Sequence, residues 1–474
     1  MRGVRNEWIG VVLLALACGG NAGNGEARPN FLILIADDQT GATLGAAGDP
    51  VARTPRLDAL AAEGVRFSNA FVTTSICSPA RASYLTGQYV RRHRVVGNPN
   101  PLPRDAVTFA SLLGSHGYDT AYVGKWHMGD VAEPRPGFAW TASFAGQGRY
   151  EDCEFYVGDS LRPTRGNVDE VSTDFAIDFL QRPRDAPFLM VVGYKGLHAP
   201  RSVPERFESL FQDASIPPPP NWSALAPYPR RTEHDAIEQG KTRTKRSRFA
   251  IAEDWTDGFD RDAHDVSRAR YLRTARKYYR SLTALDDAVG RLLDALEQSG
   301  QADDTVVVYV GDNGTHLYAH GMVGKRSAYE ESMRVEMLVR DPQAEGGRTL
   351  DPLVLNVDLA PTLLERAGVP VPAAMQGQSW LPLLHDGETD WRDAFVYEYY
   401  SGVFPFVPIQ FAIRTRDAKL VTYPGYPSWT QLFDLARDPA EAHDLASLPE
   451  RAEQRRTLLE QLHELEAELG PRID

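Results

Sequence analysis

Four short and continuously apolar runs constrain the fold of this chain more than any other feature. They are FLILIA (31–36), TAYVG (120–124), FLMVVGY (188–194) and TVVVYVG (305–311). Runs of this length, rich in β-branched and aromatic residues, are typical of strands buried on both faces of a parallel sheet. Helical patterns lie between them, including the one that begins at Thr54 and a long amphipathic stretch at 271–299. The alternation predicts an α/β domain with a large mixed, mostly parallel sheet flanked by helices.

The sequence changes character after residue 385. The segments DAFVYEYY, FAIRTRDAKLVTYP and QLFDL indicate antiparallel strands, and a helix is expected at 452–469. We therefore predict a main domain at 28–385 and a smaller C-terminal α+β domain with an antiparallel sheet at 386–474. Within the main domain, residues 213–265 mix a proline run, a basic run and an acidic run. This stretch is expected to be a surface excursion, either a solvated loop or a segment that shapes a substrate site.

The first 27 residues predict export. Arg2 and Arg5 precede an apolar run at 8–17 that ends in a small-x-small cleavage pattern, and this run is too short to cross a bilayer. Cys18, followed by two glycines, resembles a bacterial lipoprotein site. We expect a periplasmic or extracellular protein, either released or held by a lipid anchor at Cys18. The net charge of −13 argues against nucleic acid as a partner.

Two cysteines, Cys77 and Cys153, remain after Cys18. In an exported protein they would form one disulfide, or Cys77 is used chemically and Cys153 stands alone. Ser78 and Pro79 predict the start of a helix with Ser78 as its N-cap. Cys77 would then lie at the positive end of that helix, with Arg81 in the first turn.

Polar side chains follow each apolar run at once. Asp37 and Asp38 follow the first, and Asp312 and Asn313 follow the last. The run at 120–124 is followed by Lys125 and His127, and the run at 188–194 is followed by Lys195 and His198. Ligands bind at the carboxyl ends of parallel strands, so these segments are expected to meet at one edge of the sheet. Oxygen ligands favour Ca²⁺ or Mg²⁺ and leave that choice open, whereas a thiolate at Cys77 would suit such a cation poorly.

The motifs together resemble the type I, formylglycine-dependent sulfatases of the alkaline-phosphatase-like superfamily. Cys77-Ser78-Pro79-Ala80-Arg81 matches their C-x-P-x-R signature, and two more motifs surround Lys125 and His198. Lys325 lies where that family has its late active-site lysine, followed by Tyr329-Glu330-Glu331-Ser332. Leu197 and Glu336 depart from the pattern, each standing where a proline is usual.

The resemblance implies roles for these residues. Cys77 would be oxidised to formylglycine by a maturation enzyme, and its hydrated aldehyde would be the nucleophile, held by Arg81. Asp37, Asp38, Asp312, Asn313 and modified Cys77 would bind the divalent cation. Lys125 and Lys325 would neutralise charge, His127 would help to release the covalent sulfate, and His198 with Lys325 would protonate the leaving oxygen. Lys195 and His320 are expected to contact substrate. The basic run 91–94 is expected to be a solvated stripe or a second contact for an anionic substrate.

The expected activity is hydrolysis of a sulfate monoester on a sulfated carbohydrate or glycosaminoglycan-type sugar, by similarity to glycan sulfatases such as the N-acetylglucosamine-6-sulfatases. One alternative is a phosphonate monoester or phosphodiester hydrolase of the same superfamily, because the same cation cluster accepts a phosphoryl group. The other is a glycan-binding protein in which Cys77 stays a thiol.

Overall fold

The computed structural model of the protein describes residues 28–129, 135–224, 226–227, 268–322, 324–385, 390–400 and 407–473. The predicted signal segment 1–27, with Cys18, lies outside the described residues. So does most of the predicted surface excursion at 213–265.

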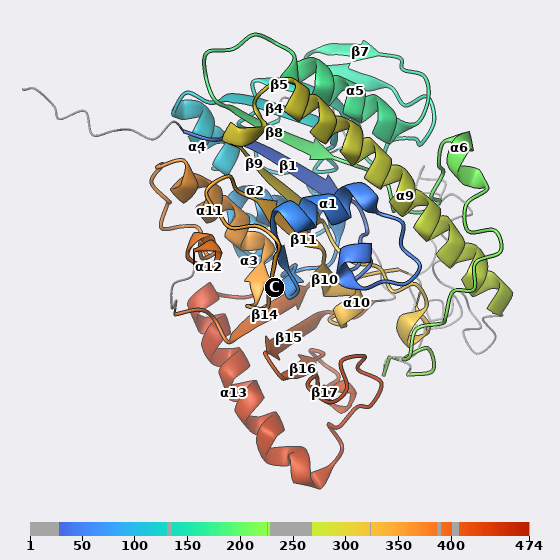
Figure 1. Ribbon diagram of the computed structural model, residues 1–474. Helices are drawn as coiled ribbons and strands as arrows, with labels where there is room; N and C mark the ends of the chain where they lie inside the picture. The colour runs from blue at the N-terminus through green and yellow to red at the C-terminus, as the bar shows by residue number, and fades with distance from the viewer. Residues whose placement is uncertain are drawn as a thin grey trace, which may run out of the picture.

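A large sheet forms the centre of the main domain (Figure 1). It has ten strands in the order β12-β2-β11-β9-β1-β8-β4-β5-β6-β7. The four predicted strands are its neighbours β9, β1, β8 and β4, and all of them run parallel. Their bounds are β1 Asn30–Ala36, β4 Asp119–Lys125, β8 Phe188–Gly193 and β9 Thr305–Gly311. The remaining strands are β2 Val65–Phe67, β5 Trp140–Phe144, β6 Phe155–Val157, β7 Ser160–Arg162, β11 Met337–Arg340 and β12 Arg348–Leu350. The predicted mixed, mostly parallel sheet is therefore confirmed.

Helices cover both faces of this sheet (Figure 1). On β1, Ile33 packs into one apolar core with residues of α2, α4 and α11, whereas Leu34 packs into another with residues of α1, α5 and α9. The bounds are α1 Pro55–Glu63, α2 Cys77–Thr86, α4 Phe109–Ser115, α5 Val168–Leu180, α9 Arg268–Gln298 and α11 Leu359–Arg366. Because both sides are buried, the strands are apolar without alternation. The long helix predicted at 271–299 is α9, which continues through Gly290.

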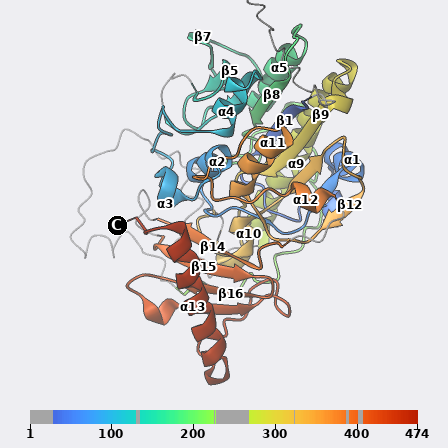
Figure 2. The same cartoon turned by 90° about the vertical axis from the view of Figure 1, so that its left-hand side faces the viewer.

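The C-terminal part carries a four-stranded antiparallel sheet, β14-β15-β16-β17, with helix α13 packed against it (Figure 2). The bounds are β14 Ala394–Tyr399, β15 Gln410–Thr415, β16 Ala418–Thr422, β17 Gln431–Asp434 and α13 Ala452–Leu469. A small sheet, β10-β3-β13, comprises β3 Ala70–Phe71, β10 Arg334–Val335 and β13 Val354–Leu355. Four short α-helices are also described: α3 Val90–His93, α6 Glu205–Glu208, α10 Glu330–Met333 and α12 Leu381–Leu384. The predicted antiparallel C-terminal sheet is confirmed, and its boundary at 385/386 stays a prediction.

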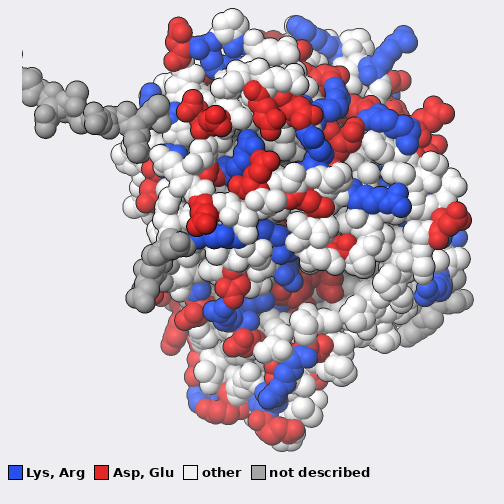
Figure 3. Space-filling view, viewed as in Figure 1, with Lys and Arg blue, Asp and Glu red and all other residues white. Residues whose placement is uncertain are grey.

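The surface carries interspersed charges of both signs on the face seen in Figure 3. In the described part of the chain, no helix has the length and apolar character needed to cross a bilayer.

Helix α2 begins two residues earlier than predicted. Its N-cap is Ile76, and Cys77 is its first residue. The Ser78 hydroxyl does not cap the helix; it donates to the backbone oxygen of His127 instead. The prediction of Ser78 as N-cap was therefore wrong, because a tertiary acceptor takes the hydroxyl. The predicted end is confirmed, since Gly87 closes the helix at φ 65°.

The basic run 91–94 is not a solvated stripe throughout. Arg91 is 2% exposed, and its Nε donates to Glu398 at 2.6 Å. Its other donors reach Glu466 and the backbone oxygen of Gly470. Arg91 therefore joins the segment after α2 to β14 and to the end of α13.

Arg91→Ala should lower the free energy of unfolding by about 3–5 kcal/mol, because it leaves the buried Glu398 carboxylate without its cation. Urea denaturation measures the change. The matched control is Arg416→Ala, which removes an ion pair with Asp351 whose side chains are 62% and 64% exposed. That control should lose less than about 1 kcal/mol. Equal losses in the two variants would contradict the role given to Arg91.

Candidate active site and metal centre

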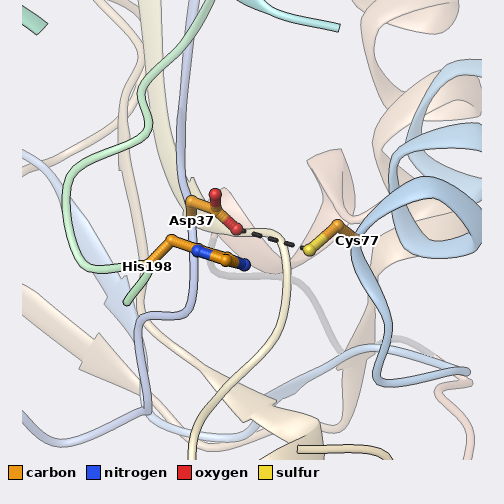
Figure 4. A group of neighbouring side chains, drawn as sticks. All are labelled: Asp37, Cys77 and His198. Atoms are coloured by element: carbon orange, nitrogen blue, oxygen red, sulfur yellow. Dashed lines mark hydrogen bonds between the residues drawn. The ribbon is translucent and has the colours of Figure 1, made fainter. Parts of the chain in front are cut away.

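Residues from distant parts of the sequence converge where the carboxyl ends of β1, β4 and β9 meet helix α2. Carboxylate oxygens of Asp37, Asp38 and Asp312 and the Sγ of Cys77 all lie within 4.8 Å of one another. A ring nitrogen of His198 also lies within 4.8 Å of a carboxylate oxygen of Asp37 and of the Sγ of Cys77. Figure 4 shows these last three side chains pointing toward one another from three separate segments. The sheet therefore brings the predicted aspartates together at the first turn of α2.

Asn313 completes this group with an oxygen that no protein donor uses. Its Nδ2 donates to Asp38 Oδ1 at 2.8 Å, which fixes the orientation of the amide. Its Oδ1 is buried and has no hydrogen-bond partner. A buried acceptor without a partner costs free energy, and a bound cation would satisfy it. Three carboxylates and this amide oxygen fit a hard divalent ion.

A cationic side chain contacts each carboxylate. Lys125 Nζ pairs with Asp37, Lys325 Nζ pairs with Asp38, and Arg81 Nε donates to Asp312 at 2.9 Å. The two ammonium groups also reach Cys77 Sγ, at 3.8 Å for Lys125 and 2.9 Å for Lys325. Arg81 donates to the backbone oxygen of Lys125 at 2.7 Å as well. An anion bound at Cys77 would therefore meet two lysines.

These neighbours decide which carboxylates stay charged. Burial alone would raise the pKa of Asp37, but the charges of Lys125, Lys325 and Arg81 hold it well below its usual value. The pKa of Asp38 is held low mainly by Lys325 against the same effect of burial. Burial and the charge of Asp37 raise the pKa of Asp312 to about 6.

The thiol of Cys77 is a poor nucleophile in this environment. It is fully buried, and burial together with the nearby Asp37 carboxylate raises its pKa to about 12. A thiolate is the reactive form of cysteine, so the thiol itself would be inert near neutral pH. The position at the helix N-terminus does not overcome burial and the adjacent carboxylates.

Neither Cys77 nor Cys153 forms a disulfide. The Cys153 Sγ accepts a hydrogen bond from the backbone N–H of Arg149 at 3.4 Å. The expected disulfide was therefore wrong, and the alternative in which Cys153 stands alone is what the structure has.

Two histidines of the site are uncharged. Burial lowers the pKa of His198 to about 3, and burial with Lys125 holds that of His127 well below its usual value. His198 Nδ1 lies 2.6 Å from the backbone oxygen of Ala199, which orients the ring. The Nδ1 of His127 is buried without a hydrogen-bond partner.

The two residues expected to contact substrate lie in different surroundings. Lys195 is 3% exposed, and burial together with Lys125 lowers its pKa to about 8. His320 stacks on Tyr329 with ring centroids 3.8 Å apart and lies 2.9 Å from the Nδ2 of Asn221. The structure groups His320 with Glu331 and Glu441 rather than with Cys77. Its contact with substrate stays a prediction.

Sequence reasoning missed two residues that contact the Lys195–His198 loop. Tyr150 and Asp169 are both 7% exposed and hydrogen-bond to the backbone of that loop. Neither belongs to a strand end or to a motif, so no signal in the sequence marked them.

Comparison with known proteins identifies a family for this chain. Residues 29–369 match the family described as Sulfatase, and residues 319–468 match the family described as N-sulphoglucosamine sulphohydrolase, C-terminal. An N-acetylglucosamine-6-O-sulfatase of Bacteroides thetaiotaomicron is 30% identical over 92% of this chain and 86% of its own.

Two solved structures share the fold over nearly the whole chain. A protein in complex with its substrate D-glucosamine-2-N,6-O-disulfate has a TM-score of 0.81 at 29% identity, covering 93% of this chain and 98% of its own. The phosphonate monoester hydrolase of Agrobacterium radiobacter has a TM-score of 0.75 at 25% identity, covering 93% and 96%. The chain belongs to the sulfatase family, whose members are sulfuric ester hydrolases with the alkaline-phosphatase-like fold.

Proposed function

We propose that this enzyme removes a sulfate ester from a sulfated sugar, with 6-O-sulfated glucosamine as the first candidate. One observation carries the proposal: the buried Cys77 position lies between the ammonium groups of Lys125 and Lys325 and beside three carboxylates. This arrangement suits a site in which a negatively charged nucleophile at residue 77 meets a negatively charged sulfate ester beside a divalent cation. The sugar is suggested by relatives that act on glucosamine sulfates.

The cation would be held by Asp37, Asp38, Asp312 and Asn313, together with an oxygen of modified Cys77. We propose Ca²⁺, with Mg²⁺ as the alternative, because all the ligands are hard oxygens. When bound, this ion supplies Lewis-acid stabilisation of the charge on the sulfuryl oxygens.

The nucleophile would be formylglycine at residue 77, with the Sγ of Cys77 marking where one of its oxygens lies. A maturation enzyme would have to make it, because converting a cysteine side chain to an aldehyde is an oxidation that needs an external oxidant. Arg81 orients this residue from the next turn of α2 while its guanidinium is fixed on Asp312. His127, uncharged and buried, would accept a proton at residue 77.

Lys125 and Lys325 would neutralise charge on the sulfate as it is attacked. His198, with Lys325, would deliver a proton to the departing sugar oxygen. His198 is uncharged in the free site, but an anionic ester bound beside it would favour the protonated imidazole. Lys195 and His320 would contact the sugar. The N-terminal segment would direct export to the periplasm or beyond, with Cys18 as the candidate lipid anchor.

The substrate assignment predicts sulfate release from N-acetylglucosamine 6-O-sulfate by protein matured with a formylglycine-generating enzyme. Ion chromatography measures the sulfate. Turnover of a matched 6-phosphate should be slower. If the phosphate or a phosphonate monoester is the better substrate, the enzyme is instead closer in activity to the hydrolase that shares its fold. Absence of turnover across a panel of sulfated sugars would refute the sugar assignment.

Metal removal should lower kcat by at least about 100-fold, since Lewis-acid stabilisation is worth several kcal/mol. Chelation by EDTA followed by addition of Ca²⁺ or Mg²⁺ identifies the ion that restores turnover. Calorimetry should show Ca²⁺ binding that Asp312→Ala weakens and Asp351→Ala, at an exposed carboxylate, leaves unchanged. Unaltered binding in Asp312→Ala would remove that residue from the metal site.

Maturation predicts a mass change at residue 77. The peptide that spans Cys77 should be lighter by about 18 Da than the thiol form when the modifying enzyme is co-expressed. The fraction of the lighter peptide should scale with kcat across preparations, and Cys77→Ala should be inactive. Full activity in a preparation that holds only the thiol form would exclude formylglycine as the nucleophile.

A further inference from the structure

Tyr150 contacts the loop that carries His198 through a single hydroxyl. Its Oη lies 2.9 Å from the backbone oxygen of Gly196 and 3.2 Å from that of Lys195, and it also contacts the backbone oxygen of His198. One phenolic hydrogen can serve one acceptor at a time, so three carbonyls that converge on it share this donor. The backbone of residues 195–198 is thereby anchored at the buried hydroxyl of Tyr150.

Asp169 holds the beginning of the same loop. Its Oδ1 accepts a hydrogen bond from the backbone N–H of Lys195 at 2.7 Å. Asp169 lies in the first turn of α5, where its own N–H is capped by Asn167 at 3.1 Å. The N–H of Val168, in the same turn, donates to the backbone oxygen of Tyr150 at 2.8 Å. This backbone hydrogen bond therefore joins the segment of Tyr150 to the helix turn that carries Asp169.

The ring of Tyr150 has a separate contact. The Lys195 ammonium lies 4.8 Å from the ring centroid, within range of a cation–π interaction. Hydroxyl and ring can therefore be tested apart, because phenylalanine keeps the ring and removes only the hydroxyl.

We propose that Tyr150 and Asp169 are positioning residues that set the distance between His198 and the leaving oxygen of the substrate. The inference rests on the proposed function, in which His198 takes part in protonating that oxygen. His198 reaches Asp37 and Cys77 from a loop, and its ring is oriented by the backbone of Ala199 in that same loop. A displacement of about 1 Å in such a group can cost about 100-fold in rate. Neither residue needs to touch the substrate.

Tyr150→Phe should lower kcat for the sugar sulfate by about 10–100-fold and leave KM unchanged, because Lys195 keeps its aromatic partner. The loss should be much smaller for 4-nitrophenyl sulfate, since nitrophenolate leaves without help from an acid. A residue that only supports the fold would lower both rates alike. The control is Tyr156→Phe, a half-buried tyrosine on β6, which should retain the wild-type ratio of the two rates.

Asp169 gives an independent test if Tyr150→Phe lowers stability. Asp169→Asn retains an oxygen for the Lys195 N–H and should keep most of the activity on the sugar sulfate. Asp169→Ala loses that acceptor and should show the same substrate-selective loss as Tyr150→Phe. Equal losses on both substrates in Tyr150→Phe and Asp169→Ala, or no loss in either, would overturn the proposal.

His198→Ala separates failure of this inference from failure of the proposed function. If His198→Ala does not lose activity selectively on the sugar sulfate, the proton-donor role of His198 is wrong. If it does so while Tyr150→Phe and Asp169→Ala do not, the proton donor stands and the positioning role is wrong.

Discussion

Three buried carboxylates within 4.8 Å of one another are the constraint on which the rest of the structure depends. Like charges at this distance in a low-dielectric interior repel strongly, so they persist only with compensating charge nearby. Lys125, Lys325 and Arg81 supply part of it, and each comes from a different element. Burial and the neighbouring charge of Asp37 raise the pKa of Asp312 even beside these cations. These buried oxygen ligands fit the metal ion that membership of the sulfatase family implies.

The same buried charges explain why the presence of Cys77 does not imply that its thiol is the nucleophile. A helix N-terminus favours an anion, and two lysines lie within 4 Å of the sulfur. Burial and the Asp37 carboxylate nevertheless outweigh these effects and keep the thiol protonated. An oxygen nucleophile that binds a hard cation escapes this conflict, since the cation takes up its charge. The electrostatics thus disfavour the sulfur of Cys77 as a nucleophile.

The sheet and the convergence of the aspartates could be predicted because both depend on local sequence. Continuous apolar runs mark strands buried on both faces, and parallel strands bring the residues after their carboxyl ends to one edge of the sheet. The errors arose where a partner lies far away in the chain. Arg91 in a basic run suggested solvent, but its partner Glu398 lies 307 positions away. Serine is a preferred residue type at helix N-caps, yet the Ser78 hydroxyl donates to the backbone oxygen of His127 instead. Tyr150 was missed for the same reason, because only the fold brings it to the His198 loop.

Glu336, at a position where the family resemblance leads to the expectation of a proline, shows how a side chain can support the segments around the site. Its carboxylate is 1% exposed and accepts hydrogen bonds from the Thr43 N–H at 2.8 Å and from Arg66 at 3.3 Å. Thr43 lies five residues after Asp38, so this side chain ties the segment after the Asp37–Asp38 pair to β2. A proline could make neither bond, and removing the carboxylate would leave Arg66 without this partner. The strand ends thus fix which groups meet in the carboxylate cluster, while side chains such as Glu336, Tyr150 and Asp169 bond to the connecting segments and hold them in place.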